Sequence, residues 1–195
     1  EKKIITKKDT GGLDLSFGNF NSAVEMTLKI INRKNKLGLG SAYREGFKYS
    51  INNGYKYLIQ MDADFSHRIE DLEKLLDLQS EYDVLIGSRY IPDGSSKGWS
   101  YSRKILSKFA NTYAKVITGT KINDMTSGFR IYSDKALNKI EYSKTKSDGY
   151  SFQIEMSSKA YKRNLKIKEV PIVFHERREG ESKMNYKIIL EALFI

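Results

Sequence analysis

The sequence predicts an α/β fold in which a mixed, mostly parallel sheet is flanked by helices. Short apolar runs alternate along the chain with segments of helical periodicity, and strands that alternate with helices tend to form parallel pairs. A chain of 195 residues buries roughly 70% of its unfolded surface, which is enough for one sizeable core. We therefore expect a single domain that covers residues 1–195.

The predicted elements become clear from Gly38 onward. Residues 23–31 form either a helix or a strand, and their pattern does not decide between the two. The glycine-rich turn at Gly38 leads into a helix over residues 42–51, which an Asn-Asn-Gly sequence ends. A buried strand follows over residues 55–61, and Ser66 is placed to cap the next helix.

The second half of the chain continues the alternation. The expected elements are, in order, a strand over residues 83–87, a loop over 92–96, a basic helix, a loop and strand over 123–132, a short helix from Ser133 and a longer helix over 151–163. Residues 165–174 alternate well enough for one more strand, and Pro171 predicts that this strand lies at the edge of the sheet.

Composition removes several classes of protein. With no cysteine and two prolines, the chain is neither a disulfide scaffold, a cysteine-ligated metal protein nor a proline-rich fibre. It has no uninterrupted apolar run of about 18 residues and no apolar core of a signal peptide, so we expect neither a membrane span nor an export address. The first residue is not Met and the last lies inside an apolar run, so a fragment is one interpretation.

One segment of the chain supplies much of the net charge of +10. Residues 97–121 contain six basic residues and no acidic residue, and apolar side chains recur there at spacings of three and four. This pattern predicts an amphipathic helix over residues 99–118. Such a helix either lies on an anionic membrane surface or packs on the core with a solvated basic face. Nucleic acid is not expected as a partner, because no repeated basic and aromatic motif is present.

Two carboxylates follow the strand over residues 55–61. Asp62 and Asp64 are two residues apart and point to the same side in extended geometry, at the strand end where open α/β sheets bind ligands. A carboxylate pair suits Mg²⁺ or Mn²⁺ with a phosphorylated substrate. The alternative is that one Asp caps the next helix while the other is exposed.

Basic residues are placed to reach the same cleft. Arg89 follows the strand over residues 83–87, and Arg177 and Lys183 lie in a polar loop that is able to close over phosphates. A solvated charged loop is the alternative interpretation. Glu155 either faces the cleft or pairs with a Lys. The two histidines have no Ser or Cys partner in a triad pattern, so nucleophilic hydrolysis is not expected.

Taken together, the motifs resemble the polyprenol-phosphate (dolichol-phosphate) mannosyltransferases, which are inverting family 2 glycosyltransferases of the GT-A fold. The resemblance covers about residues 37–192, and Trp99, Arg103 and Ser107 also stand in family-like positions. The matching blocks are Gly38-Leu39-Gly40-Ser41-Ala42, Met61-Asp62-Ala63-Asp64-Phe65-Ser66-His67, Gly87-Ser88-Arg89-Tyr90, Asp124-Met125-Thr126-Ser127-Gly128-Phe129-Arg130, and Glu169-Val170-Pro171-Ile172-Val173-Phe174 through Gly180-Glu181-Ser182-Lys183.

The resemblance implies transfer of mannose from GDP-mannose to a polyprenyl phosphate, with inversion, at the cytoplasmic face of a membrane. It implies that Asp62 and Asp64 hold Mg²⁺ or Mn²⁺ on the donor diphosphate, although the family commonly has Gln in place of Ser66. The roles implied for the basic groups are acceptor phosphate binding by Arg89, Arg103 and Ser107, and closure on the diphosphate by Arg177 and Lys183. It also implies that the basic helix is a membrane-interface helix.

The front of the chain departs from this family. Residues 1–36 match neither of the two blocks that hold the nucleotide in its members, so we expect an N-terminally truncated or diverged domain. Two alternatives stay open: a non-catalytic remnant that binds a membrane or a partner, and a related transferase that uses another nucleotide sugar such as UDP-glucose.

Overall fold

A computed structural model describes residues 30–33, 35 and 37–176 of the chain. The chain divides into two units, Glu1–Leu37 and Gly38–Ile195, and the elements below all belong to the second. Among the described residues, no helix is both long and apolar enough to cross a membrane.

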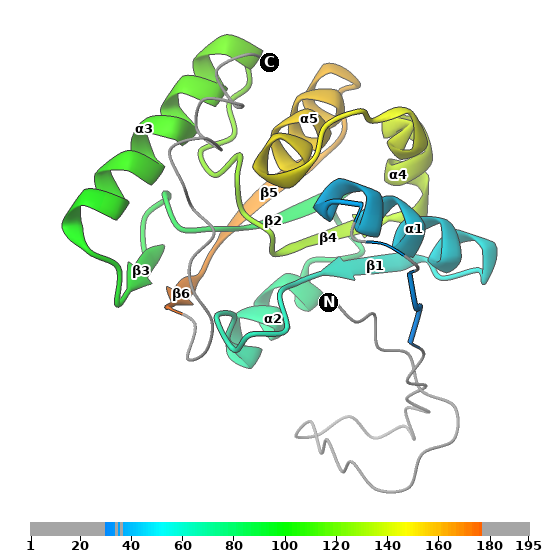
Figure 1. Cartoon of the computed structure of the whole chain (residues 1–195), viewed down its shortest axis with the longest axis horizontal. Helices are drawn as coiled ribbons and strands as arrows, with labels where there is room; N and C mark the ends of the chain where they lie inside the picture. The colour runs from blue at the N-terminus through cyan, green and yellow to red at the C-terminus, as the bar shows by residue number, and fades with distance from the viewer. Residues whose placement is uncertain (1–29, 34, 36, 177–195) are drawn as a thin grey trace, which may run out of the picture. The chain divides into compact units, whose positions relative to one another are not determined.

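The second unit is built on a four-stranded sheet (Figure 1). Its strands, in spatial order, are β1 (Tyr57–Gln60), β4 (Arg130–Ser133), β2 (Val84–Ser88) and β5 (Ile167–Pro171). The pairing of β2 with β5 is parallel, whereas β4 pairs antiparallel with both β1 and β2. Three strands therefore share one direction and β4 opposes them, which confirms the mixed, mostly parallel sheet.

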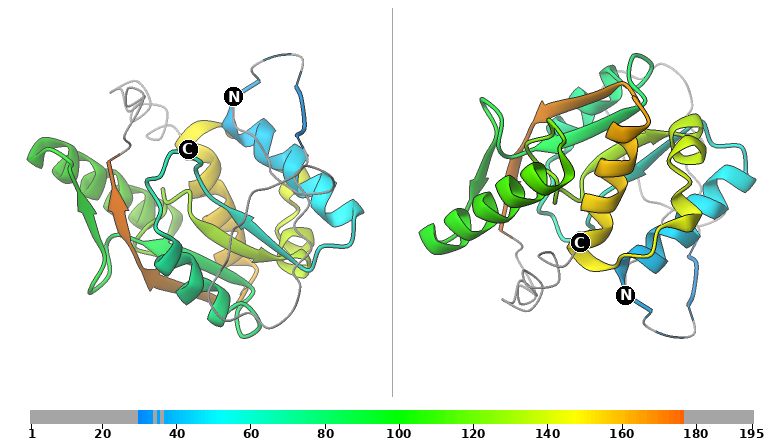
Figure 2. Two further views of the ribbon diagram at one scale, coloured as in Figure 1. Left: turned by 90° about the horizontal axis from the view of Figure 1, so that it is seen from below. Right: turned by 90° about the horizontal axis from the view of Figure 1, so that it is seen from above.

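Helices cover both faces of this sheet. Three helices lie over one face, α1 (Leu39–Asn52), α4 (Asp134–Ile140) and α5 (Gly149–Lys162), and a short 3₁₀ turn at Tyr142–Lys144 joins the last two. Among the helices of the described residues, α2 (Ile69–Asp77) is the one that lies on the other face (Figure 2). The alternation of side chains along the strands divides the core accordingly, because Leu58 and Ile86 pack in the cluster with α5 while Leu85 packs with Leu75 of α2.

The third part is a small extension beside the sheet. It consists of α3 (Tyr101–Thr118) and a parallel pair of short strands, β3 (Ser95–Lys97) and β6 (Val173–His175). Helix α3 begins at Ser100, whose hydroxyl accepts a hydrogen bond from the backbone N–H of Arg103, and ends at Gly119 in the left-handed conformation. This extension carries most of the basic residues noted above.

The structure corrects three of the predicted elements. Residues 95–97 form a strand where a loop was expected, and the single strand expected over 165–174 is divided at Ile172 into β5 and β6. β5 lies at the sheet edge as Pro171 predicted. Ser66 does not cap α2, whose N-cap is Arg68; its hydroxyl binds Asp64 instead.

The core on the α2 side yields a stability test. Leu75 of α2 is fully buried, so Leu75→Ala should lower the free energy of unfolding by about 2–5 kcal/mol through lost contacts and a residual cavity. Leu106→Ala on α3, where the side chain is 41% exposed, should cost about 1 kcal/mol or less. Urea unfolding followed by circular dichroism measures both, and equal losses would contradict the described core.

Candidate functional site

Asp62 and Asp64 lie at the carboxyl end of β1, as the sequence predicted. The hydroxyl and the backbone N–H of the buried Ser66 both donate to Oδ1 of Asp64, at 2.5 and 3.2 Å. A Cβ added at Gly128 would lie 3.8 Å from Oδ2 of Asp62, so the loop before β4 approaches the first carboxylate closely. Asp64 is thus oriented by its own turn, and Asp62 faces a neighbouring loop.

Arg89 lies at the carboxyl end of β2 and is held in a buried ion pair. Its Nε and Nη2 donate to the two oxygens of Asp124 at 2.8 and 2.7 Å, and Nη2 also donates to the hydroxyl of Thr126 at 2.9 Å. The side chains of Arg89 and Asp124 are 8% and 0% exposed. Burial alone would raise the pKa of Asp124, but the guanidinium outweighs burial and holds that pKa below its ordinary value.

The loop over residues 123–129 is fixed from two sides. Glu169 of β5 accepts hydrogen bonds from the backbone N–H groups of Asn123 and Asp124, both at 2.9 Å, and from the hydroxyl of Ser88 at 2.7 Å. The fully buried Arg130 donates to the backbone carbonyls of Met125 and Ser127, at 2.9 and 2.8 Å. These bonds set the position of Asp124 and hence of Arg89.

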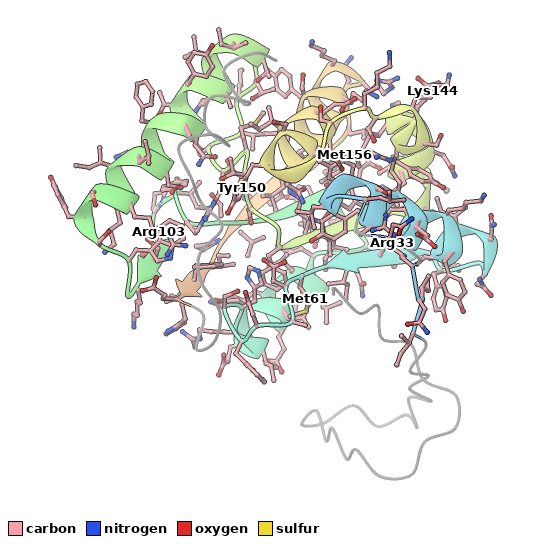
Figure 3. The ribbon with its side chains drawn as sticks, viewed as in Figure 1. Arg33, Met61, Arg103, Lys144, Tyr150 and Met156 are labelled. Atoms are coloured by element: carbon pink, nitrogen blue, oxygen red, sulfur yellow. The ribbon has the colours of Figure 1, made fainter. Side chains whose placement is uncertain are left out.

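Arg103 and Trp99 form the outer part of the site. The guanidinium of Arg103 lies 4.2 Å from the centre of the Trp99 ring, and that of Arg89 lies 5.3 Å from it. Nη1 of Arg103 donates to Glu176 at 2.7 Å. Figure 3 shows Arg103 where the first turn of α3 meets β3. Trp99 is buried although it precedes α3, so it belongs to the site and not to the helix as the sequence suggested.

Ser107 is also close to these groups. It is fully buried, and its hydroxyl accepts a hydrogen bond of 2.6 Å from the phenol of Tyr90, the residue after Arg89. Burial raises the pKa of the Tyr90 phenol, so this group is a proton donor at neutral pH. Tyr90 therefore joins the end of β2 to the middle of α3.

Strand β6 brings the carboxylate pair and the arginine site together. The ring of Phe174 lies 5.4 Å from both His67, three residues after Asp64, and Trp99. The backbone N–H of His175 donates to the carbonyl of Ser66, and that of Glu176 to the carbonyl of Lys97, each at 3.0 Å. The two groups of site residues, predicted from separate motifs, thus lie on either side of one short strand.

The outward surface of α3 is apolar. Its large side chains do not pack on the core, which corrects the interpretation of a core-packing helix with a solvated basic face. The residues with the largest exposed fractions are Tyr101 at 79%, Val116 at 72%, Phe109 at 59%, Ile117 at 57% and Ile105 at 52%. The buried positions of α3 are instead the small residues Ser107, Asn111 and Ala114.

The sequence model of the family described as Glycosyl transferase family 2 matches residues 23–141. This range includes both the carboxylate pair and the arginine site. The chain belongs to glycosyl transferase family 2. It is 44% identical over 166 residues to the polyprenol monophosphomannose synthase of Mycolicibacterium smegmatis, an alignment that covers 85% of this chain and 63% of that protein. It is 38% identical over 172 residues to the undecaprenyl-phosphate mannosyltransferase of Micrococcus luteus, covering 88% and 71%.

The family match agrees with the mixed α/β fold and begins earlier than the sequence suggested. It starts at residue 23, whereas the resemblance in the motifs starts at about residue 37. The chain spans just under two thirds of the length of the M. smegmatis relative.

Some predicted residues are not part of the described site. Arg177 and Lys183 lie outside the described residues, which end at Glu176, next to Arg103. Glu155 does not reach the carboxylates; it forms an ion pair of 3.1 Å with Lys159 and accepts from the backbone of Ser147. Glu169 stands in one of the matching blocks, but the sequence assigns no role to it, because its hydrogen-bond partners Ser88, Asn123 and Asp124 are distant along the chain.

The residues present suit a divalent cation. In the part of the chain that is described, no group of three or more His, Cys, Asp or Glu residues is placed to hold a metal ion, so Asp62 and Asp64 would be the ligands that the protein supplies. Mg²⁺ binds in this manner to one or two carboxylates, with substrate phosphates and water completing the shell. The donor set is all oxygen, which also accommodates Mn²⁺.

The buried ion pair predicts a large stability difference between two carboxylate substitutions. Asp124→Asn leaves the Arg89 guanidinium buried without its counter-charge and should cost about 3–5 kcal/mol. Glu176→Gln removes the half-exposed partner of Arg103 and should cost about 1 kcal/mol or less. Chemical denaturation measures both losses of stability. Similar losses would show that the ion pair between Arg89 and Asp124 does not stabilise the loop over residues 123–129.

The same pair predicts the pH dependence of unfolding. The pKa of Asp124 is lowered in the folded state. Its contribution to the free energy of unfolding is therefore complete above its pKa in the unfolded chain, about 4, and is lost as the pH falls through its lower pKa in the folded state. The difference in unfolding free energy between the native chain and Asp124→Asn should therefore shrink below about pH 4. A difference that stays constant to the lowest pH at which the chain is folded would contradict this.

Proposed function

We propose that this chain transfers mannose, with inversion, from GDP-mannose to a polyprenyl phosphate in a reaction that depends on Mg²⁺ or Mn²⁺. The observation that carries the proposal is the juxtaposition across β6 of the carboxylate pair with Arg103 and Trp99. One side suits a nucleotide diphosphate and the other suits a second phosphate. The names of both relatives refer to mannose and to a polyprenol or its phosphate.

Asp62 and Asp64 are assigned to the donor. They would hold the divalent cation on the donor diphosphate, where the cation neutralises charge on the departing nucleoside diphosphate. Ser66 keeps one oxygen of Asp64 engaged, so it orients this carboxylate although it stands where the family commonly has Gln. In the same proposal, Arg177 and Lys183 close on the diphosphate.

Arg103 and Ser107 are assigned to the acceptor phosphate. Arg103 is only partly exposed and is stacked on Trp99, so its donor fork is held in place before the phosphate arrives. Nε and Nη2 of Arg89 are engaged by Asp124 and Thr126, so Arg89 is held in place and acts on the acceptor through its charge and its position beside Trp99.

The reaction does not require a strong general base. A phosphate acceptor is already anionic at neutral pH, so its oxygen attacks the sugar carbon without first losing a proton. Orientation of the two substrates and neutralisation of the leaving diphosphate supply most of the catalysis. The residues Arg89, Asp124 and Glu169 serve to position the substrate-binding groups. Neither histidine is assigned the role of a general base.

The acceptor lipid requires a membrane, and α3 is suited to contact one. Its outward stripe of Tyr101, Ile105, Phe109 and Val116 is exposed, and Lys104, Lys108 and Lys115 lie along one flank. A helix with this arrangement lies in the interface with its apolar face toward the acyl chains and its lysines at the anionic headgroups. The proposal places the chain at the cytoplasmic face, peripherally or with an anchor elsewhere in the protein.

Incubation of the chain with radiolabelled GDP-mannose, Mn²⁺ and a short polyprenyl phosphate tests the reaction. Label should move into the lipid phase, and it should not do so when Mn²⁺ is chelated. UDP-glucose in a parallel sample tests the other nucleotide sugar. Absence of labelled lipid, while a full-length relative is active in the same assay, would refute the activity for this chain.

Asp64→Ala should abolish metal-dependent GDP binding and leave the fold intact, because Asp64 lies after the end of β1, in the turn that it forms with Ser66. Asp77→Ala, at the exposed end of α2, is the matched control and should bind GDP normally. Calorimetric titration with GDP and Mn²⁺ measures both. Normal binding by Asp64→Ala, or unfolding without loss of binding in the folded fraction, would make Asp64 a structural residue.

Replacement of two outward residues of α3 tests the membrane contact. Phe109→Ser with Val116→Ser should lower the affinity for phosphatidylcholine vesicles by about 100-fold, since two large exposed side chains no longer enter the interface. Ile69→Ser removes a comparably exposed residue on α2 and should have no effect. Vesicle flotation compares them, and an unchanged double variant would exclude α3 as the contact.

A further inference from the structure

A pocket of about 480 Å³ opens beside the second half of α3 and adjoins the arginine site at Tyr90. Its walls are Lys108, Thr112 and Lys115 of α3 and Asn123 of the chain returning from Gly119, with Tyr90 also contributing. The turn is formed by Gly119 at φ 66°, which sends the chain back along the helix and leaves a hollow between the two. The volume lies within the range of small-ligand sites.

The lining is positively charged and contains no carboxylate. The Lys115 ammonium donates to the neutral amide oxygen of Asn123 at 2.7 Å, and neither Lys108 nor Lys115 forms an ion pair with any described carboxylate. Two acidic side chains adjoin Asn123 and are already engaged: Asp124, the next residue, pairs with Arg89, and Glu169 accepts from Asn123 and from the backbone of Asp124. The pocket therefore suits an anion.

The helix dipole acts against this charge but is too weak to cancel it. The pocket lies near the carboxyl end of α3, where the dipole is equivalent to roughly half a negative charge. Two ammonium groups carry four times that charge with the opposite sign. They are seven residues apart, about 10 Å along the helix, so one anionic group is reached by both when the long side chains bend toward it.

The pocket is separate from the acceptor site. Arg103 precedes Lys108 and Lys115 by 5 and 12 residues, which puts it about 120–140° around the helix from them. The hydrogen bond between Tyr90 and Ser107, 2.6 Å long, lies on the boundary between the two regions. A ligand in the pocket consequently does not occupy the position assigned to the acceptor phosphate.

We propose that this pocket binds the phosphate group of an anionic membrane phospholipid that is not a substrate. The neighbouring surface favours a lipid over a free anion, because Val116 both lines the pocket and is 72% exposed on the apolar stripe of α3. A lipid with its phosphate between the lysines can thus lay its acyl chains along the helix. The inference rests on the membrane contact of α3 proposed above, but it does not depend on sugar transfer.

The test measures binding to vesicles that contain no polyprenyl phosphate, with neither donor nor metal present. Binding to pure phosphatidylcholine is compared with binding to mixed phosphatidylcholine and phosphatidylglycerol vesicles, for the native chain and for Lys108→Gln with Lys115→Gln. The matched control is Lys104→Gln with Lys121→Gln, which removes the same charge from the same segment outside the pocket lining. Circular dichroism verifies that all variants are folded.

Removal of two lysines near an anionic surface weakens binding by at most about 30-fold through general attraction. The proposal predicts that the pocket pair loses at least about tenfold more than the control pair, because charge-assisted hydrogen bonds are lost as well. Equal losses in the two pairs would overturn the site and leave only general attraction. Failure of the native chain to bind neutral vesicles would instead refute the membrane contact of α3.

A charge-neutral variant and a free anion complete the test. Thr112→Phe should fill the pocket and lower the preference for phosphatidylglycerol about tenfold while binding to neutral vesicles is kept. An unchanged preference would overturn the proposal. Titration with inorganic phosphate alone should give no saturable binding; saturable binding that is lost in the pocket pair would assign the pocket to free phosphate and overturn the lipid assignment.

Discussion

The ion pair between Arg89 and Asp124 is the interaction on which the rest of the site depends. Two charges that are almost fully buried are stable only if their geometry is fixed, since a lone charge in that position costs several kcal/mol. Glu169 and Arg130 provide this by holding the backbone on both sides of Asp124. In this arrangement Arg89 is no longer a freely moving ligand, and the partly exposed Arg103 is the guanidinium that we propose as the principal contact for an incoming phosphate.

Helix α3 packs against the site through small residues and leaves its large apolar side chains exposed. Its core side is made of Ser107, Asn111 and Ala114, which bury little apolar area but hydrogen-bond to the site loop, as Asn111 does to Thr126. The large apolar side chains are left outside, where a soluble protein rarely exposes a contiguous patch without a partner. The position of the helix is thus fixed by polar contacts, and its apolar surface is available for a lipid bilayer.

The sequence was sufficient for the sheet, most of the helices and the location of Asp62, Asp64 and Arg89 at strand ends, because these depend on periodicity and on local order along the chain. It was not sufficient where long-range contacts decide. The pattern of α3 is compatible with an inward or an outward apolar face, and long-range contacts such as those of Asn111 with Thr126 accompany the outward one. Glu169 was missed for the same reason, since its partners are more than 40 residues away. Ser66 is a residue type that favours helix caps, but its N–H and hydroxyl donate to the side chain of Asp64, which forms an Asx turn instead.

The central claim is that the carboxylate pair and the arginine site form one centre across β6. Trp99 is the single Trp of the chain, so its indole N–H gives one resolved NMR resonance. Addition of Mn²⁺ with GDP should broaden this resonance selectively, and the same addition to Asp64→Ala should leave it sharp. A sharp indole resonance in the native chain under conditions where Mn²⁺ and GDP are bound would contradict the account.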